Sequence, residues 1–439
     1  MKKSVLIIGG GVAGLAAARE LVRNDVAVTV LEANDRCGGR IQTIRDGGVP
    51  VELGAEFVHG ESEPLLRTIK EAKLFAPPVS EQNHLLENGK LSEVDLWKVI
   101  EDVIGRIEPD GTDCSCDEFL AASIREPERT YVRHFVQGFH AADPGRISAQ
   151  ALYRGEEAAK QMNGTTQLRL ADGYAALVDF LERDIIQLDG VIHKKMTVQQ
   201  VNWQRGSVEV LAEARSVGLV SPEPHEFDSV PPIGGKPETR IEKFAAEAAV
   251  VALPLGVLKR GDVRFDPPLV SHELAIRGME CGNVVKIMLF FDPPFWDDFG
   301  FIHSFAEPIP TWWSDPLKPM LTGWAGGPKA EALLNRSHAQ MEALALEVLA
   351  RIFPDKAAAL PQHFKRSYYW NWADDPFIRG AYSYIPVRGL ALPKLLAEPV
   401  VDTIFFAGEA TVADAQTGTV FGALATGLRA ARECLANGA

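Results

Sequence analysis

The chain has 439 residues, of which 46% are hydrophobic and 24% charged, and its net charge is −14. This length exceeds the roughly 250–300 residues at which a single hydrophobic core stops growing, so two domains are expected. The acidic balance argues against a nucleic-acid partner. It is compatible with a cationic substrate, although acidity more commonly serves solubility. No segment approaches the roughly 18 uninterrupted apolar residues of a membrane span, so no membrane partner is expected.

The five cysteines are odd in number and thinly spread, and Cys114 and Cys116 have the wrong spacing for C-x-x-C redox or zinc chemistry. We therefore expect reduced thiols, no metal site and a cytoplasmic protein. The apolar run that follows Met1 is not expected to be a secretory signal, because glycines interrupt it and charged residues follow from Arg19 onward.

The first 23 residues predict a strand, a glycine turn and a helix. Ser4–Ile8 is an apolar, partly β-branched run typical of a strand buried in a parallel sheet. Gly9, Gly11 and Gly14 follow at G-x-G-x-x-G spacing, and Val12–Arg23 has helical periodicity. The first glycine permits the tight turn, the second lets the backbone approach a pyrophosphate, and the third allows close helix–strand packing.

A second strand is predicted over residues 26–31, and Glu32 closes it 18 residues after Gly14. An acid at this position can accept hydrogen bonds from a ribose, while the helix N-terminus attracts phosphates. Together these features predict a dinucleotide site and leave NAD or FAD open. Residues 49–60 then predict a strand, a turn and a strand, in which His59 is either close to a reactive centre or a structural histidine.

The middle of the chain predicts helices and then strands. Residues 61–161 are mainly helical, 164–173 form a loop, 174–184 a helix, and 191–201, 208–212 and 245–251 strands. Residues 221–237 are rich in Pro, Gly and acids and predict a surface loop. Four aromatic residues of the helical part are expected in its core: Trp97, Phe119, Phe135 and Phe139.

The strand Val284–Phe291 contains Lys286 inside an otherwise apolar run. A lysine in mid-strand between apolar flanks is expected to be buried, with a lowered pKa, and it can act as a base or hold a water. A helix is predicted over residues 330–353, and the aromatic cluster in residues 368–384 suggests a ligand wall.

The last segment has the same kinds of features as the first: a strand, an acid and a helix N-terminus. Residues 403–407 predict a strand, Gly408 and Glu409 a turn with an acid, and residues 418–437 a helix that begins at Thr419 and Val420. This second free helix N-terminus can face the other end of a cofactor, where negative charge develops on a reduced ring.

Together these motifs resemble the flavin amine oxidase family, which includes monoamine oxidases, polyamine oxidases and lysine-specific histone demethylases. The blocks that carry the resemblance lie at residues 9–14, 32, 36–40, 53–60, 250–258, 284–291, 372–384 and 406–427. The resemblance implies an α/β fold: a Rossmann-like FAD-binding domain (parallel sheet plus β-meander) with an inserted α+β substrate-binding domain. The implied FAD-binding segments are 1–75, 165–265 and 398–439, and the substrate-binding segments are 76–164 and 266–397.

The resemblance also implies a role for individual residues. Glu32 would bind the adenosine ribose, Arg40 the pyrophosphate and Glu409 the ribityl chain or nearby ribose. Further implied FAD contacts come from Glu56, Val198 (through its backbone), Trp372, Gly408 and the amides of Thr419 and Val420. On the substrate side, Lys286 would hold a water at flavin N5, Tyr382 would form one wall of an aromatic cage, and His59 would lie nearby.

Two departures from the monoamine oxidases refine the expectation. Their flavin-linking cysteine is replaced by Ala381, so FAD should be bound non-covalently, and their second cage tyrosine is replaced by Thr419. The half-open cage favours an extended amine, with a polyamine as the preferred substrate and oxygen as the electron acceptor. Aromatic monoamines, amino acids and alkaloid amines stay open as substrates. So do an FAD-dependent desaturase or isomerase and a non-enzymatic flavoprotein. The sequence predicts no oligomeric state.

Overall fold

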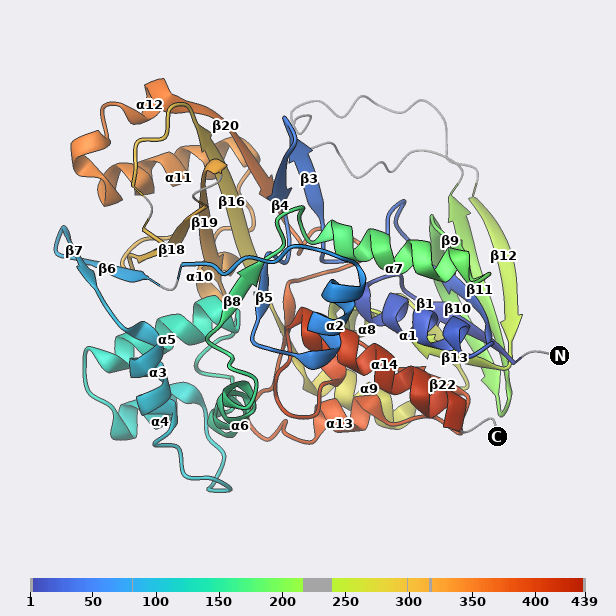
Figure 1. Ribbon diagram of the computed structural model, residues 1–439. Helices are drawn as coiled ribbons and strands as arrows, with labels where there is room; N and C mark the ends of the chain where they lie inside the picture. The colour runs from blue at the N-terminus through green and yellow to red at the C-terminus, as the bar shows by residue number, and fades with distance from the viewer. Residues whose placement is uncertain (1–2, 81, 216–238, 298, 316–317, 437–439) are drawn as a thin grey trace.

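The computed structural model describes residues 3–80, 82–215, 239–297, 299–315 and 318–436 (Figure 1). The predicted surface loop at 221–237 lies outside these residues. A parallel sheet flanked by helices forms one half of the molecule in this view. A large second sheet and a group of helices form the other half. The α/β fold predicted from the sequence is confirmed.

The parallel sheet has β1 at its centre, as expected for an apolar run that is buried on both faces. Ile7 is fully buried and pairs with Val30 on one side and Val250 on the other. The strand order is β22 (Ile404–Phe406), β13 (Ala248–Val251), β1 (Ser4–Ile8), β2 (Ala27–Leu31) and β9 (Val191–His193). The carboxyl ends of β1, β13 and β22 therefore meet at one edge of the sheet, where a dinucleotide is expected to bind.

Helix α1 (Val12–Arg23) packs against both α7 (Ala175–Gln187) and α14 (Val420–Ala436). A Cβ at Gly427 would lie 2.1 Å from the carbonyl oxygen of Ala13, so glycine permits the close approach of α14 to α1. The helix at the end of the chain thus packs directly on the helix at its beginning (Figure 1).

The predicted β-meander lies beside the parallel sheet. It consists of β12 (Thr239–Ala246), β11 (Ser207–Arg215) and β10 (Met196–Gln204), with β14 (Arg264–Asp266) added in parallel to β10. The smaller elements of this half are β3 (Thr43–Asp46), β4 (Val49–Glu52), α2 (Glu63–Glu71), α8 (Leu255–Arg260), α9 (Val270–Gly278), α13 (Leu392–Ala397) and the 3-10 turn η2 (Glu409–Thr411).

The second large sheet has β16 (Val284–Phe291) paired antiparallel with strands on both sides, so this apolar run is buried along its whole length. The order is β20 (Phe364–Trp370), β16, β19 (Lys318–Gly326), β18 (Thr311–Asp315), β17 (Phe301–His303), β6 (Asn83–Glu87) and β7 (Lys90–Glu93). Residues 61–161 are mainly helical, as predicted, but they also contribute the unpredicted strands β6 and β7, a hairpin that completes a sheet whose other strands come some 200 residues later.

The remaining helices of this half cover the sheet or form a separate group. Helix α11 (His338–Ile352) packs on β16 and β20, and α3 (Leu96–Ile104), α4 (Cys116–Ser123), α5 (Glu128–Phe139) and α6 (Ala149–Lys160) share one hydrophobic cluster. The other short elements are β15 (Glu280–Gly282) and β21 (Tyr382–Tyr384), which pair with each other, η1 (Pro354–Lys356) and α12 (Leu360–His363).

Three further local predictions need correction. The segment 164–173 is not only a loop, since β8 (Gln167–Arg169) pairs with β5 (Phe57–His59). The helix predicted over 330–353 is instead two helices, α10 (Pro328–Glu331) and α11. Ser337 is the N-cap of α11 and forms a capping box there, so the second helix begins after it. Phe139 is not a core residue: it is 38% exposed at the end of α5, whereas Phe135 is buried as predicted.

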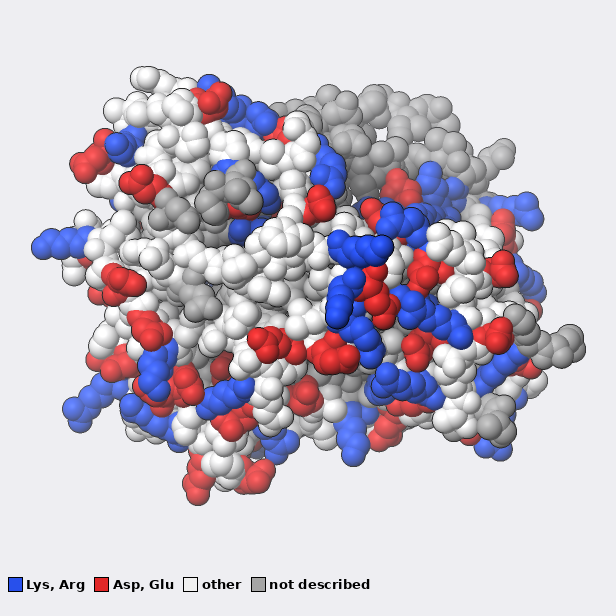
Figure 2. All heavy atoms as spheres, in the orientation of Figure 1, with Lys and Arg blue, Asp and Glu red and all other residues white. Residues whose placement is uncertain are grey.

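The strands of the parallel sheet and the meander come from three separate stretches of the chain, and those of the second large sheet from the stretches between them. On this distribution we propose the domain division given above, with the FAD-binding segments 1–75, 165–265 and 398–439. Acidic and basic side chains are interspersed over the face shown in Figure 2. No helix among the described residues is long and apolar enough to cross a membrane.

Candidate active site

A cavity of about 630 Å³ is lined by residues of both halves of the molecule. Its wall includes Gly9 and Glu32 from the parallel sheet, Lys286 from β16 and Phe139 from the end of α5. All but one of the residues predicted for the site line it: Gly9, Gly11, Glu32, Arg40, Glu56, His59, Val198, Lys286, Trp372, Tyr382, Gly408, Glu409, Thr419 and Val420. The exception is Gly14, where a Cβ would lie 2.0 Å from the carbonyl oxygen of Gly9, so this glycine serves helix–strand packing.

The N-terminus of α1 is open toward the cavity. Its N-cap is Gly11, which offers no side-chain hydrogen bond, and no acid lies in the first turn. A Cβ on Gly11 would meet nothing within 4 Å, and Gly9 has a φ of +105° that disfavours other residues. This end of the cavity therefore presents unpaired N–H groups and empty space to an anionic group such as a pyrophosphate.

Glu32 fixes the shape of this turn. Its Oε2 accepts a hydrogen bond from the Gly10 amide at 2.7 Å, and its Oε1 accepts one from the Asn34 amide at 2.7 Å. Burial raises the pKa of Glu32, and the two amides partly offset that effect. A carboxylate has about four acceptor positions, so capacity for ribose hydroxyls is left.

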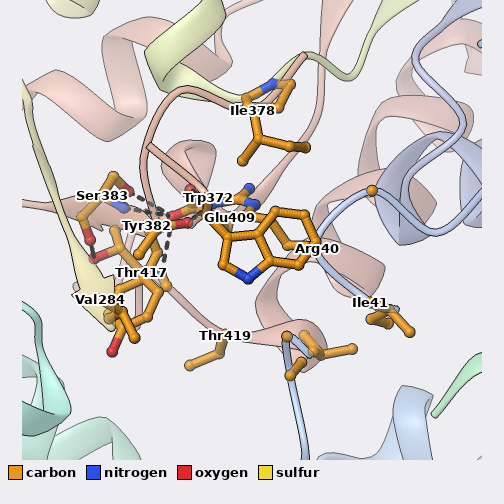
Figure 3. Close-up of a pocket in the computed structure, with 18 of the residues that line it drawn as sticks. Arg40, Ile41, Val284, Trp372, Ile378, Tyr382, Ser383, Glu409, Thr417 and Thr419 are labelled. Atoms are coloured by element: carbon orange, nitrogen blue, oxygen red, sulfur yellow. Dashed lines mark hydrogen bonds and ion pairs between the residues drawn. The ribbon is translucent and has the colours of Figure 1, made fainter. Parts of the chain in front are cut away.

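Arg40 and Glu409 join the two ends of the chain at the cavity wall (Figure 3). Arg40 Nη1 lies 2.8 Å from Glu409 Oε1 and also donates to the Ala381 carbonyl at 2.6 Å. Glu409 Oε2 accepts from Ser383 Oγ at 2.6 Å and from the Gly418 amide at 2.9 Å. Sequence reasoning did not identify Ser383, although it lies next to the predicted cage residue Tyr382.

The N-terminus of α14 is the second open helix end. Thr419 Oγ1 accepts a hydrogen bond from the Gly422 amide at 3.1 Å and donates to the Gln416 carbonyl, so its hydroxyl caps the helix. The amides of Thr419 and Val420 have no acceptor in the described part of the chain. They can therefore face an anionic ring edge, as the resemblance implied.

Lys286 is 2% exposed, and its environment differs from the expected one. Its Nζ lies 2.7 Å from Glu56 Oε2 and donates to the Gly54 carbonyl at 3.1 Å. The apolar flanks of the lysine gave no sign of this partner, a buried carboxylate that balances its charge. Glu56, expected among the cofactor contacts, uses one oxygen on Lys286 and the other on Trp313 Nε1, at 3.1 Å.

Aromatic side chains form part of the cavity wall. Tyr382 donates its hydroxyl to the Phe139 carbonyl at 2.9 Å, and Trp324 Nε1 donates to the Gly138 carbonyl at 2.8 Å, so the end of α5 holds both rings. Trp372 is buried, and its Nε1 donates to the Leu53 carbonyl at 3.0 Å. Burial raises the pKa of Tyr382, so it is a neutral hydrogen-bond donor at pH 7.

His59 lines the cavity, and its buried Nδ1 has no hydrogen-bond partner among the described residues. Its ring meets Phe139 edge-on, at 5.4 Å between centroids. Burial lowers the pKa of His59 to about 4, so the imidazole is neutral at pH 7. This nitrogen is buried even in the empty cavity, so the geometry does not decide between a structural role and a ligand contact. His140 has the same properties, with a free Nε2 and a pKa of about 4, and sequence reasoning missed it.

Glu156 on α6 is a second residue that sequence reasoning missed. It lines the cavity together with Leu96, Trp97 and Ile100, and no described residue forms a hydrogen bond or ion pair with it. Burial raises its pKa to about 7, so the carboxyl is about half ionised at pH 7. Its neighbour Glu157 bonds to Lys160 at 2.7 Å instead.

The comparisons with known proteins agree with this geometry. The model of the flavin-containing amine oxidoreductases matches residues 12–109 and 111–435. The chain belongs to this family. It is 30% identical to polyamine oxidase 2 of Arabidopsis thaliana, over 98% of this chain and 88% of that protein. It is also 27% identical to lysine-specific histone demethylase 2 of Homo sapiens, over 99% of this chain and 53% of that protein.

Solved structures of amine oxidases have the same fold. A putrescine oxidase bound to putrescine superposes with a TM-score of 0.80 at 20% identity, and 99% of each chain is covered. Cyclohexylamine oxidase from Brevibacterium oxydans gives a TM-score of 0.79 at 19% identity, again with 99% of each chain covered. The protein is an FAD-dependent amine oxidase, and the cavity has the two open helix ends, the glycine turn and the acid that FAD requires.

Proposed function

We propose that the enzyme oxidises a polyamine at a carbon next to nitrogen, with oxygen as the electron acceptor. The observation that carries the substrate class is Glu156, an unpaired carboxylate that lines the same cavity as Tyr382 and Thr419. A polyamine has a second cationic nitrogen several bonds from the reacting one, and a half-buried carboxylate without a partner is a complementary group. The polyamine oxidases among the relatives and the acidity of the chain support the same class.

The proposed reaction balances as amine plus oxygen plus water giving aldehyde, shorter amine and hydrogen peroxide. Bound FAD supplies the hydride acceptor. The chain's own residues bind and orient: Tyr382 and Trp324 provide rigid aromatic walls, and both are anchored to carbonyls at the end of α5. Holding the amine carbon in a fixed position supplies much of the rate enhancement in such reactions.

Glu156→Gln tests the substrate class. This substitution keeps the shape of the side chain and removes its charge. We expect KM for spermidine and other polyamines to rise at least tenfold, about 1.4 kcal/mol of binding free energy, with a small change in KM for a monoamine. Glu157→Gln is the matched control, because Glu157 is the adjacent acid of α6 and pairs with Lys160. An equal effect of Glu156→Gln on polyamines and monoamines would remove the polyamine assignment.

One observation favours a second candidate, a hydrophobic monoamine. The cavity wall includes Leu96, Trp97, Phe135 and Phe139, which would suit an apolar ring as well as a methylene chain. A panel of polyamines, aromatic monoamines and amino acids, with peroxide detection, separates the two. If no amine of the panel bleaches the flavin absorbance anaerobically, the proposed oxidation is wrong.

A further inference from the structure

We propose that Glu56 is a positioning residue that holds Lys286 as a cation directed into the cavity, so that Lys286 acts as a fixed positive charge and not as a proton acceptor. The inference deepens the proposed oxidase function and rests on it. It assigns to Glu56 a role toward the lysine in place of the cofactor contact that the sequence suggested.

The contacts of the lysine leave one direction open. An ammonium has three N–H donors. Lys286 uses one on Glu56 Oε2, at 2.7 Å, and one on the Gly54 carbonyl, at 3.1 Å. Both Lys286 and Glu56 are buried, and both line the cavity. The third donor is therefore available to a group inside the cavity.

A second layer of charge keeps Glu56 ionised. Its Oε1 accepts from Trp313 Nε1 at 3.1 Å and lies 2.8 Å from Arg169 Nη2. Arg169 also contacts Asp315 at 3.2 Å, and Lys318 contacts Asp315 at 3.1 Å. Burial opposes the charge of Glu56, but the neighbouring cations lower its pKa to about 2. At working pH Glu56 therefore has no proton to give to Lys286 and does not readily accept one.

Five side chains form one network of ion pairs in which cations and carboxylates alternate: Lys286, Glu56, Arg169, Asp315 and Lys318. Glu52 also has an electrostatic link to the lysine; burial raises its pKa to about 7, and it accepts from Thr43 Oγ1 and the Tyr174 amide. The three cations and two carboxylates of this network leave one net positive charge. Removing Glu56 would leave Lys286 without the carboxylate that contacts it.

This arrangement has a consequence for the reaction with oxygen. In the half-reaction that regenerates the oxidised enzyme, oxygen takes up two electrons and two protons and leaves as hydrogen peroxide, and negative charge develops on it before the protons arrive. A fixed cation in a site shielded from water stabilises such a charge. In this role Lys286 stabilises the charge and transfers no proton, so the rate of this half-reaction should be independent of pH around neutrality.

A double-mutant cycle tests the proposal on the holoenzyme. The enzyme is reduced with dithionite, and its reoxidation by oxygen is followed from pH 6 to pH 10, together with the midpoint potential of the bound flavin. Lys286→Met should slow reoxidation at least tenfold at every pH. Glu56→Gln should leave a rate that falls as pH rises, because burial without a counter-ion favours the neutral form of an amine. It should also lower the flavin potential at high pH.

The double variant decides whether Glu56 acts through Lys286. We expect Glu56→Gln to have less than a twofold effect on reoxidation in the Lys286→Met background. Independent, multiplying effects, or a rate of the Glu56→Gln enzyme that does not vary with pH, would overturn the proposal. Because dithionite replaces the amine, a failure of the polyamine assignment does not affect this result.

Two further variants distinguish a specific effect of Glu56 from a general loss of structure. Trp313→Phe removes one hydrogen bond to Glu56 and retains an aromatic side chain, so it should shift the pH profile in the same direction by a smaller amount. Asp184→Asn is the control for disturbing an ion pair in general, because Asp184 pairs with Arg19 and does not line the cavity. It should leave the reoxidation profile and the flavin potential unchanged. A change as large as that of Glu56→Gln would contradict a specific role.

Discussion

Arg40 and Glu409 lie 369 positions apart in the chain and form an ion pair of 2.8 Å between Nη1 and Oε1. The pair links the segment after the glycine turn to the turn before α14, and Glu409 has a second set of bonds to Ser383 and Gly418. The two regions of the sequence that resemble FAD-binding motifs are thus held together by a charged contact at the wall of the FAD cavity.

Glu409→Gln is expected to weaken this junction. The substitution leaves the guanidinium of Arg40 without its carboxylate, and a charged hydrogen-bonding group left unpaired costs about 1.5–3 kcal/mol. We expect a lower melting temperature of the apoprotein and at least tenfold weaker FAD retention, measured by thermal unfolding and by flavin fluorescence during dialysis. Glu433→Gln is a control in α14, where the partner Arg429 is 3.6 Å away.

Gly11 and Gly14 should respond differently to the same change. Gly11→Val places methyl groups in open cavity space, so the apoprotein should fold normally and lose FAD affinity at least tenfold. Gly14→Val instead drives a Cβ to 2.0 Å from the Gly9 carbonyl, so it should destabilise the fold itself. Circular dichroism on the apoproteins and FAD titration separate the two effects. Normal FAD binding by Gly11→Val would contradict the placement of the cofactor there.

The flavin should be released from the protein by denaturation. Ala381 occupies the position before the cage tyrosine, and a methyl side chain has no atom that can bond to the flavin. Acid precipitation is expected to leave all yellow colour in the supernatant, with an FAD mass in mass spectrometry. Flavin that stays with the pellet would show a covalent link at another residue.

The preference for polyamines should depend on pH. Burial raises the pKa of Glu156 to about 7, so the carboxyl is protonated below that pH in the free enzyme and cannot bind a cation. We expect the ratio of kcat/KM for spermidine to that for a monoamine to fall about tenfold per pH unit below pH 7 and to level off above it. In Glu156→Gln this ratio should be small and independent of pH. The ratio is used because ionisation of the reacting amine affects both substrates.

The strands and helix starts that were predicted correctly are those determined by residues adjacent in the sequence. Ser4–Ile8 and Val284–Phe291 are strands with the predicted bounds, and Lys286 is buried, because a strand buried on both faces needs a continuous apolar run. The helix starts at Val12 and Val420 were likewise marked by glycines and by Thr419. For such elements the residue pattern alone contains the physical cause.

The errors concern partners that are distant in sequence. Strand β8 exists because it pairs with β5 over 100 positions earlier, and its own three residues carry no pattern that distinguishes a strand from a loop. Lys286 and Glu56 are 230 positions apart, so the ion pair could not be inferred from the apolar flanks of the lysine. Glu156 was missed for the same reason, since a glutamate on a helix is usually exposed and only the fold places this one in a cavity.

The packing of α14 on α1 has a consequence for the order in which the protein is made. The central sheet lacks its edge strand β22, and the cavity lacks Glu409 and the N-terminus of α14, until the segment from β22 to α14 has been synthesised. FAD can therefore be captured in its complete site only after the residues of α14 have left the ribosome. Nascent chains and C-terminally truncated forms should hold the first strand–turn–helix without the cofactor.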